Sequence, residues 1–557
     1  MDVGTALRLS PFVRPSPFLR PWRILRRNSH LGCDVTPPVD SRAARLWAWV
    51  AAHLEIVIAL AAFALYAVTV YPGVGGVVNY GDSAKFQFLG RILGLSHPPG
   101  APLYLLATFL WSWLPLGVTP AISINLFSAA CASGALALVY LAIRRLKVAT
   151  LPALAAVALL GLTPVFWEFA TEAELYGPLT LCVAFFVHRM LVWWQDRRER
   201  DLYLLLGGYF ASFGVHYLMV LLVPALFWGI TRGPWRPAVR LRSLARIAGL
   251  GLLAALPLAY FGLRHSTAPY SEAPAVLDAG AYLDYILSRG YQGHMFNGTV
   301  QEVLALHPWQ ERAVFLDQFT GWGLALAGLG LIALVVRRQK GLAAFLLLGI
   351  GVPILFVASY NIPDRLGFYL PSLVILTLAA GAGLGAIWDL ARVPRRQWTL
   401  VAPFVVAPVL VLTAMHGAQG YQALRQILPD DILRDAGTGE VWDIHRLAEL
   451  AEPESVVLVP WYDYGHREIA NYARFTAPDV DARGIRFEWT DDPPRDWTWA
   501  QRAFRPDPKT NRIVYAFSTG HRDLLVRAGY RVTRIALQRD NGDTFHVFEA
   551  RPAVLAK

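Results

Sequence analysis

The sequence is short of charged residues and of cysteine. Charged residues make up 16% of its 557 positions, whereas a soluble protein carries roughly 25%, so much of the surface must face something other than water. The three cysteines, Cys33, Cys131 and Cys182, are too few and too scattered for a disulfide framework or a zinc site. So little charge also excludes a disordered chain and a coiled coil.

Three catalytic motifs are missing as well. No Gly-x-x-x-x-Gly-Lys-Ser/Thr loop occurs, which argues against nucleoside triphosphate chemistry. Neither His-Glu-x-x-His nor Gly-x-Ser-x-Gly occurs, which argues against zinc proteases and serine hydrolases of those types. The net charge of +11 does not indicate nucleic-acid binding, because no basic stripe is interleaved with aromatic residues.

Hydrophobic residues make up 55% of the chain. They are grouped in long runs, and arginines stand at the ends of these runs. A spanning helix needs about 20 apolar residues, and Lys and Arg gather at its cytoplasmic end. Applied in chain order, these rules predict a multi-pass protein of the plasma (inner) membrane with a cytoplasmic N-terminus and about eleven crossings. The predicted crossings are Ala44–Val70, Ala121–Ile143, Leu151–Phe166, Leu175–Trp194, two short helices within Tyr203–Ile230 that turn near Gly214-Val215-His216, Ile247–Gly262, Phe315–Val336, Leu342–Ser359, Phe368–Leu390 and Thr399–Met415.

The same reading divides the chain into three parts. Residues 1–43 form a cytoplasmic basic tail without the apolar core of a signal peptide. Residues 44–416 form the transmembrane domain, whose first external loop, 71–120, is long and contains a short interfacial stretch, Leu103–Leu116. Residues 417–557 form an extracytoplasmic domain.

In that last domain the apolar runs shrink to strand length and charged residues become frequent. The expected strands are Val456–Val459, Gly484–Trp489, Arg512–Phe517, Arg531–Ala536 and Thr544–Glu549, and the expected helices are Gly465–Arg474 and Gly520–Ala528. Alternating strands and helices predict a small soluble α/β domain of roughly 130 residues. We expect it to shape the choice of acceptor, with Trp461 and Tyr462 either stacking on a ligand beside Asp463 or packing the strand end, and its carboxylates, such as Asp491 and Asp492, to take no part in the chemistry.

The unusual polar residues fall in the predicted external loops. They are Asp82, Lys85 and His97 in the first loop, Glu172 and Glu174 in the second, His216 in the third, Arg264 and Tyr291 in the fourth, and Asn361, Asp364 and Arg365 in the fifth. Charged groups at a membrane boundary are costly to desolvate and are therefore functional candidates. Each one singly is better explained by solvation at the interface, but the gathering of carboxylates, histidines and arginines on one side favours a shared site.

That set of residue types suits sugar transfer from a lipid-linked phosphate donor. The cations would hold the phosphate as it leaves, while a carboxylate would take the proton of the attacking hydroxyl. Either Arg264 or Arg365 would grip the phosphate, since the planar guanidinium matches phosphate oxygens; alternatively, each reaches to the lipid headgroups. A transporter or flippase of a lipid-linked glycan is the alternative, and it predicts charged residues at mid-membrane, of which the apolar runs are nearly free. A binding scaffold that only presents a partner through the external domain is a third reading.

Five motifs that follow one another in the chain resemble a known family. Gly81-Asp82-Ser83 is followed by His97-Pro98-Pro99-Gly100, by Thr171-Glu172-Ala173-Glu174-Leu175-Tyr176, by the Gly214-x-His216 turn and by Tyr360-Asn361-Ile362-Pro363-Asp364. Over about residues 45–375 the chain resembles a GT-C membrane glycosyltransferase family that is related to the protein O-mannosyltransferases and includes a eukaryotic transmembrane O-mannosyltransferase. The implied fold is a GT-C-like polytopic helical domain.

The resemblance also implies an activity and roles for residues. It implies a polyprenyl-phosphate sugar donor, with mannose as the sugar, a protein or glycan hydroxyl as acceptor, Asp82 as the catalytic residue, His97 lining the site, and Glu172 or Glu174 near donor or acceptor. The chain departs from the family at Ala84-Lys85, where relatives carry Gly-Glu. Without that acid Asp82 has no expected carboxylate neighbour, so metal binding by this loop is not supported. No cofactor is predicted, and a divalent metal stays the open alternative. Lys85 would meet the donor phosphate or be a solvated helix residue.

Overall fold

The computed structural model of the chain describes residues 42–76, 80–232, 240–296, 300–360, 365–391, 406–420, 446–460, 464–476, 480, 482–490, 504–506, 512–538 and 544–553, with isolated positions between them. Residues 1–54 and 55–557 form two separate compact units. The first contains α1 (Arg42–Ala52). Trp49 of this helix stacks on His53, the residue after its end, with ring centroids 4.9 Å apart. The second unit contains the functional site.

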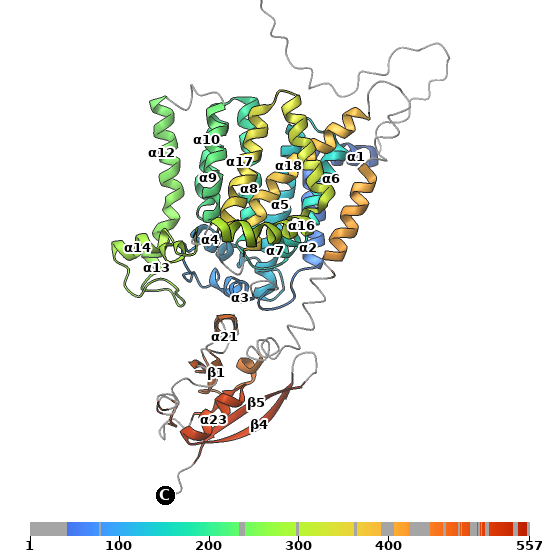
Figure 1. Ribbon diagram of the computed structural model, residues 1–557. Coiled ribbons are helices and arrows are strands. Elements are labelled where there is room, and N and C mark those ends of the chain that lie inside the picture. The colour runs from blue at the N-terminus through green and yellow to red at the C-terminus, as the bar shows by residue number, and fades with distance from the viewer. Residues whose placement is uncertain are drawn as a thin grey trace, which may run out of the picture. The chain divides into compact units, whose positions relative to one another are not determined.

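Helices make up most of the second unit (Figure 1). They are α2 (Leu54–Val68), α3 (Tyr80–Leu89), α4 (Pro102–Trp111), α5 (Pro120–Arg145), α6 (Thr150–Gly161), α7 (Pro164–Thr171), α8 (Tyr176–Asp196), α9 (Glu199–Ser212), η1 (Tyr217–Leu222), α10 (Val223–Arg232), α12 (Leu241–Ala255), η2 (Leu256–Leu258), α13 (Ala259–Arg264), α14 (Ala279–Ile286), α15 (Arg289–Gln292), α16 (Val300–Val336), α17 (Lys340–Ala358), η3 (Leu366–Tyr369) and α18 (Leu370–Leu390). Residues 406–420 are also helical.

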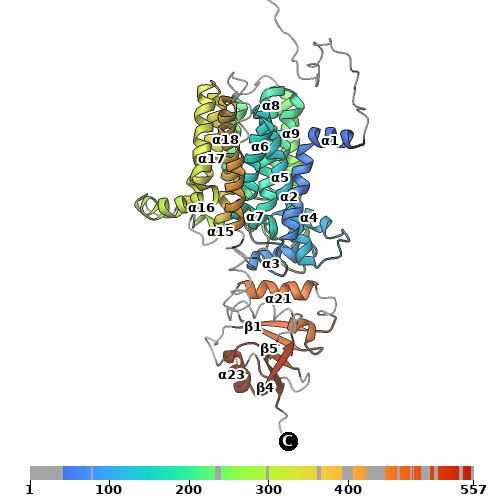
Figure 2. The same cartoon turned by 90° about the vertical axis from the view of Figure 1, so that its right-hand side faces the viewer.

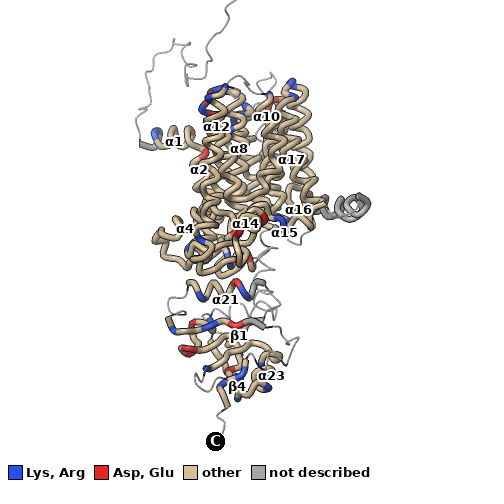
Figure 3. Tube along the Cα trace, turned by 90° about the vertical axis from the view of Figure 1, so that its left-hand side faces the viewer, with Lys and Arg blue, Asp and Glu red and all other residues tan. Residues whose placement is uncertain are grey.

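Six helices among the described residues are long and apolar enough to cross a membrane. They are Pro120–Arg145, Tyr176–Asp196, Leu241–Arg264, Phe315–Val336, Lys340–Ala358 and Leu366–Leu390. A seventh results if α6 and α7, which are bent by 67°, form one span. Lys and Arg lie mainly at the end of the bundle away from α3 and α4 (Figure 3), as expected where basic residues flank spans.

Each predicted crossing contains a helix, but several are shorter than a full span, so the count of eleven stays a prediction. The predicted first span is wrong as a single helix, because the chain breaks at His53 between α1 and the 15-residue α2. The two predicted crossings Leu151–Phe166 and Leu175–Trp194 imply a turn at Trp167–Ala173 between them. This segment is largely helical, since α7 continues to Thr171. The predicted fourth loop also contains helices: α14, α15 and the beginning of α16.

Helix α18 lies at the centre of the bundle, and nearly all of its residues are buried. It crosses α16 where Gly330 and Gly383 meet, and neither position has room for a side chain. A Cβ on Gly330 would lie 1.8 Å from the carbonyl oxygen of Ala379, and one on Gly383 would lie 2.0 Å from that of Leu326. Small residues let two helix backbones approach this closely in a membrane.

We therefore expect Gly330→Ala to destabilise the bundle by about 1–3 kcal/mol, because the added methyl group forces α16 and α18 apart. Gly328→Ala on the same helix is the matched control, since nothing lies within 4 Å of a Cβ there. It should be neutral or slightly stabilising. Thermal unfolding of both proteins in the same detergent measures the difference, and equal unfolding temperatures would contradict the assigned crossing.

The C-terminal region forms a five-stranded mixed sheet. Its strands are β1 (Val456–Pro460), β2 (Arg486–Thr490), β3 (Val514–Ala516), β4 (Tyr530–Gln538) and β5 (Thr544–Pro552), in the order β2-β1-β3-β5-β4. β1 pairs in parallel with β2 and β3, whereas β5 is antiparallel to β3 and β4. With α21 (Tyr464–Thr476) and α23 (Thr519–Ala528), the five expected strands and two expected helices are confirmed. Trp461, Tyr462, Asp463, Asp491 and Asp492 lie outside the described residues.

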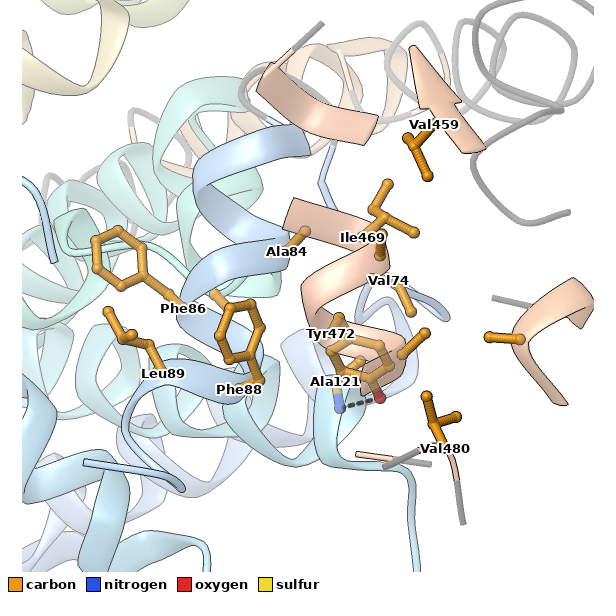
Figure 4. Packing of buried hydrophobic residues seen from close by; sticks show 14 of the residues in the cluster. Val74, Ala84, Phe86, Phe88, Leu89, Ala121, Val459, Ile469, Tyr472 and Val480 are labelled. Carbon is orange, nitrogen blue, oxygen red and sulfur yellow. Dashed lines mark hydrogen bonds between the residues drawn. The ribbon is translucent and has the colours of Figure 1, made fainter. Parts of the chain in front are cut away.

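Helix α21 packs directly on α3. Figure 2 shows this in the whole chain, and Figure 4 shows it from close by. One buried apolar cluster contains Phe88 and Leu89 of α3 together with Ile469 and Tyr472 of α21. The Tyr472 hydroxyl accepts a hydrogen bond from the backbone N–H of Ala121 at 3.2 Å. The sheet region and the loop after α2 therefore share a hydrophobic core.

Candidate functional site

Helix α3 presents Asp82 and Lys85 on one face, because residues three apart in a helix are neighbours. The Lys85 side chain is fully buried, and its Nζ lies 2.6 Å from Asp82 Oδ1. The Asp82 side chain keeps 22% of its surface exposed. Lys85 is therefore not the solvated helix residue that the sequence allowed. It is a buried cation paired with the partly exposed carboxylate of Asp82.

Two further groups reach the same ammonium. His97 Nδ1 lies 2.7 Å from Lys85 Nζ, and Glu272 Oε2 lies 3.1 Å from it. Backbone bonds fix these groups relative to each other: Leu95 N–H donates to the Tyr270 carbonyl at 2.9 Å, and Glu272 N–H donates to the Leu95 carbonyl at 3.0 Å. We call Asp82, Lys85, His97 and Glu272 the lysine cluster.

The ammonium sets the protonation of its partners. An ammonium group has donors only, so His97 Nδ1 accepts from Lys85 and the ring carries its proton on Nε2. Burial by itself would lower the pKa of Lys85, but the Asp82 and Glu272 carboxylates overcome this and raise it. Burial would raise the pKa of Glu272, but the Lys85 ammonium holds it well below its usual value.

These shifts define the pH range in which the lysine cluster stabilises the fold. A carboxylate with a depressed pKa contributes stability above its ordinary pKa of 4.5 and loses it as the pH falls through the folded value. A lysine with a raised pKa contributes below its ordinary value of 10.5 and loses it as the pH rises through the folded value. The ion pairs are therefore complete across the whole neutral range.

Helix α21 supplies the next layer of charge. Arg467 Nη2 lies 2.9 Å from Glu272 Oε1, and the same guanidinium lies 2.6 Å from Glu468 Oε1. The Tyr270 hydroxyl donates to Glu468 Oε1 at 2.8 Å. Glu468 is fully buried, and burial raises its pKa although Arg467 and Lys85 oppose the shift.

Glu172 and Glu174 form a second acidic group beside the neighbouring face of α3. Both are buried, and Ser83 Oγ donates to Glu174 Oε1 at 3.5 Å. Gly76 is needed here, because a Cβ would lie 2.4 Å from Glu172 Oε2 and 2.6 Å from Ser83 Oγ. Consecutive residues of α3 thus connect these carboxylates to the lysine cluster.

His216 and Tyr291 lie around the lysine cluster. His216 Nδ1 accepts from the backbone N–H of Leu218 at 3.1 Å, and burial lowers its pKa to about 3, so the ring is neutral. The Gly214 carbonyl accepts from Leu103 N–H at 2.7 Å, which joins the turn before His216 to the beginning of α4, directly after the His-Pro-Pro-Gly loop. Tyr291 meets His97 edge to face at 6.2 Å; burial raises its pKa, with Asp82 adding to the shift.

The two predicted phosphate-binding arginines are Arg264, the last residue of α13, and Arg365, which lies directly before η3. Arg264 Nε donates to the carbonyl of Leu93 at 3.0 Å and Nη2 to that of Ile92 at 3.3 Å, so its guanidinium braces the turn after α3. Arg365 precedes η3, whose Phe368 packs 5.9 Å from the His216 ring. Asn361 and Asp364 lie outside the described residues.

Four residues of the site were not among the candidates predicted from the sequence: Tyr270, Glu272, Arg467 and Glu468. The expectation that Asp82 lacks a carboxylate neighbour is wrong, because Asp82 and Glu272 share Lys85. Glu272 belongs to a predicted external loop that holds several polar residues, and no local spacing connects it with α3. Across the described part of the chain, no group of three or more His, Cys, Asp or Glu residues is arranged to hold a metal ion.

The fold has counterparts among solved structures, and part of the chain matches a family model. Residues 82–237 match the family described as protein O-mannosyl-transferase TMEM260 N-terminal domain. ArnT from Cupriavidus metallidurans in the apo state is 13% identical with a TM-score of 0.56, covering 91% of this chain and 98% of ArnT. ArnT bound to undecaprenyl phosphate is 13% identical with a TM-score of 0.55, covering 92% and 99%. No curated protein sequence matches the chain.

At this identity the likeness to ArnT shows a shared fold. Together with the matched family segment, which begins at Asp82, it confirms the resemblance to GT-C membrane glycosyltransferases.

Proposed function

We propose that the chain is an integral-membrane glycosyltransferase that moves a sugar from a polyprenyl-phosphate donor to a hydroxyl of a protein or glycan on the extracytoplasmic side. The observation that carries this is the buried Lys85 ammonium beside the partly exposed Asp82 carboxylate. ArnT with the same fold binds undecaprenyl phosphate, which supports a polyprenyl-phosphate partner. The matched family supports mannose as the sugar and a protein hydroxyl as the acceptor.

The proposed reaction needs one base and one phosphate-binding cation. The acceptor oxygen attacks the anomeric carbon, the bond from that carbon to the phosphate oxygen breaks, and the acceptor proton passes to Asp82. The released polyprenyl phosphate carries the new negative charge, which the Lys85 ammonium offsets. The Nε2–H of His97 is a second donor for a phosphate or sugar oxygen, and Glu172, Glu174 and Tyr291 line the surroundings.

The orientation belongs to the same proposal. The N-terminus is cytoplasmic, about eleven crossings follow, and residues 417–557 lie outside with the first external loop, where a lipid-linked donor and a secreted acceptor meet. This rests on the basic residues at the opposite end of the bundle.

A transfer assay tests the function directly. Purified protein in lipid is given radiolabelled polyprenyl-phosphate mannose and an extracytoplasmic protein fraction. Label appearing in protein, or slow release of free sugar to water, supports the glycosyltransferase. Movement of labelled lipid across the bilayer without either product would instead identify a flippase.

A further inference from the structure

Glu272 is shared between the lysine cluster and helix α21. Its Oε2 lies 3.1 Å from Lys85 Nζ and its Oε1 lies 2.9 Å from Arg467 Nη2, with only 15% of the side chain exposed. Arg467 also holds Glu468, and its Nη2 donates to the Tyr270 hydroxyl at 3.3 Å. One carboxylate therefore connects a cation of the first external loop to a cation of the C-terminal region.

Apolar contacts hold Arg467 in this place. Phe88 of α3 stacks on Phe475 of α21 with ring centroids 5.4 Å apart, and it meets Tyr270 edge to face at 5.5 Å. The three segments that carry Lys85, Glu272 and Arg467 thus meet at Phe88, which makes the ion pairs part of a packed interface.

Arg467 supplies one of the two positive charges that face the carboxylates of this interface. Asp82, Glu272 and Glu468 contribute three negative charges when ionised, and Lys85 and Arg467 contribute two positive ones. His97 adds no charge while its Nδ1 accepts from Lys85. Loss of Arg467 would leave a single cation among three carboxylates, and Glu272 would then direct its whole charge at Lys85, which weakens the attraction of Lys85 for a phosphate.

We propose that Arg467 is a positioning residue of the donor site: it draws Glu272 away from Lys85 and so leaves the lysine able to bind an anionic phosphate. This rests on the proposed function. It also extends the expected role of the C-terminal region, which would both shape acceptor choice and complete the donor site through α21.

The test measures binding of undecaprenyl phosphate by the full-length protein in lipid nanodiscs. Arg467→Gln should weaken binding about tenfold, and Arg467→Lys should recover part of the loss. The matched control is Arg551→Gln, which removes an equal charge from a half-exposed arginine on β5 that pairs with Glu549 of the same strand and with Glu452 before β1, and it should leave binding unchanged.

Repeating the substitution in a Glu272→Gln protein distinguishes a positioning role of Arg467 from a purely structural one. If Arg467 acts through Glu272, then Arg467→Gln should have little effect in a Glu272→Gln protein. The loss should also diminish as the pH is lowered, because Glu272 without Arg467 takes up a proton at a higher pH and releases Lys85. The groups that face Glu272 in this titration are Lys85 and Asp82 of α3, His97, Tyr270, Tyr285 and Tyr291 of the loops, and Arg467 and Glu468 of α21.

The outcomes separate this inference from the proposed function. Unchanged binding by Arg467→Gln, or an equal loss in both backgrounds, overturns the role of Arg467 while wild-type binding still supports the donor site. Failure of the wild-type protein to bind any polyprenyl phosphate overturns the proposed function, and the inference with it.

Discussion

Asp82→Asn should lower the rate of sugar transfer by roughly 10²–10⁴-fold. The substitution keeps the shape of the side chain but removes its capacity to accept the proton of the attacking hydroxyl. Donor affinity should stay the same or increase, because Lys85 loses one of the carboxylates that compete with the phosphate for its ammonium. A fall in turnover without weaker donor binding distinguishes a base from a binding residue.

The control for this variant is Asp284→Asn. Asp284 lies on α14 with 51% of its side chain exposed, in an ion pair with Arg289, and its loss should leave transfer unchanged. Initial rates at saturating donor, normalised to the amount of folded protein, give the comparison. Wild-type turnover by an Asp82→Asn protein of normal abundance would remove Asp82 from the catalytic role.

Lys85→Met should have the second large effect, on both stability and donor binding. Removing one partner of a buried ion pair costs about 3–5 kcal/mol, because the remaining charges stay buried without compensation. Here Asp82 and Glu272 would be left facing each other. Loss of a charged contact to the phosphate should weaken donor binding about 10–100-fold.

A double variant separates these two effects. Lys85→Met combined with Glu272→Gln removes the cation and one carboxylate together, so stability should return toward the wild-type value. Donor binding should remain weak, because no ammonium is left to receive the phosphate. Thermal unfolding and undecaprenyl phosphate binding, measured on the same samples, decide the matter. Recovery of donor affinity in the double variant would mean that Lys85 only neutralises Glu272.

Local sequence was sufficient to predict the elements that carry the site. Apolar runs predicted the helices, because a segment in lipid must satisfy its own backbone hydrogen bonds whatever surrounds it. Alternating strand-length and helical runs predicted all five strands of the C-terminal sheet with α21 and α23, since these periodicities are read over a few residues. Breaks inside apolar sequence, such as those at His53 and between α6 and α7, were not predicted, because apolar residues continue on both sides and the helix-start pair Thr163-Pro164 was read as part of one span.

The sequence by itself determined that this is a membrane-embedded protein with its polar motifs in the loops, and it singled out Asp82, Lys85 and His97. Only the tertiary structure decided what Lys85 does. The choice between a solvated lysine and a buried one depends on the groups packed around α3, and those come from Glu272 and from Arg467 of α21, far along the chain. A buried charge needs a partner of opposite sign, but that rule does not say which distant carboxylate supplies it. Packing of the loop after α13 and of α21 against α3 makes that choice.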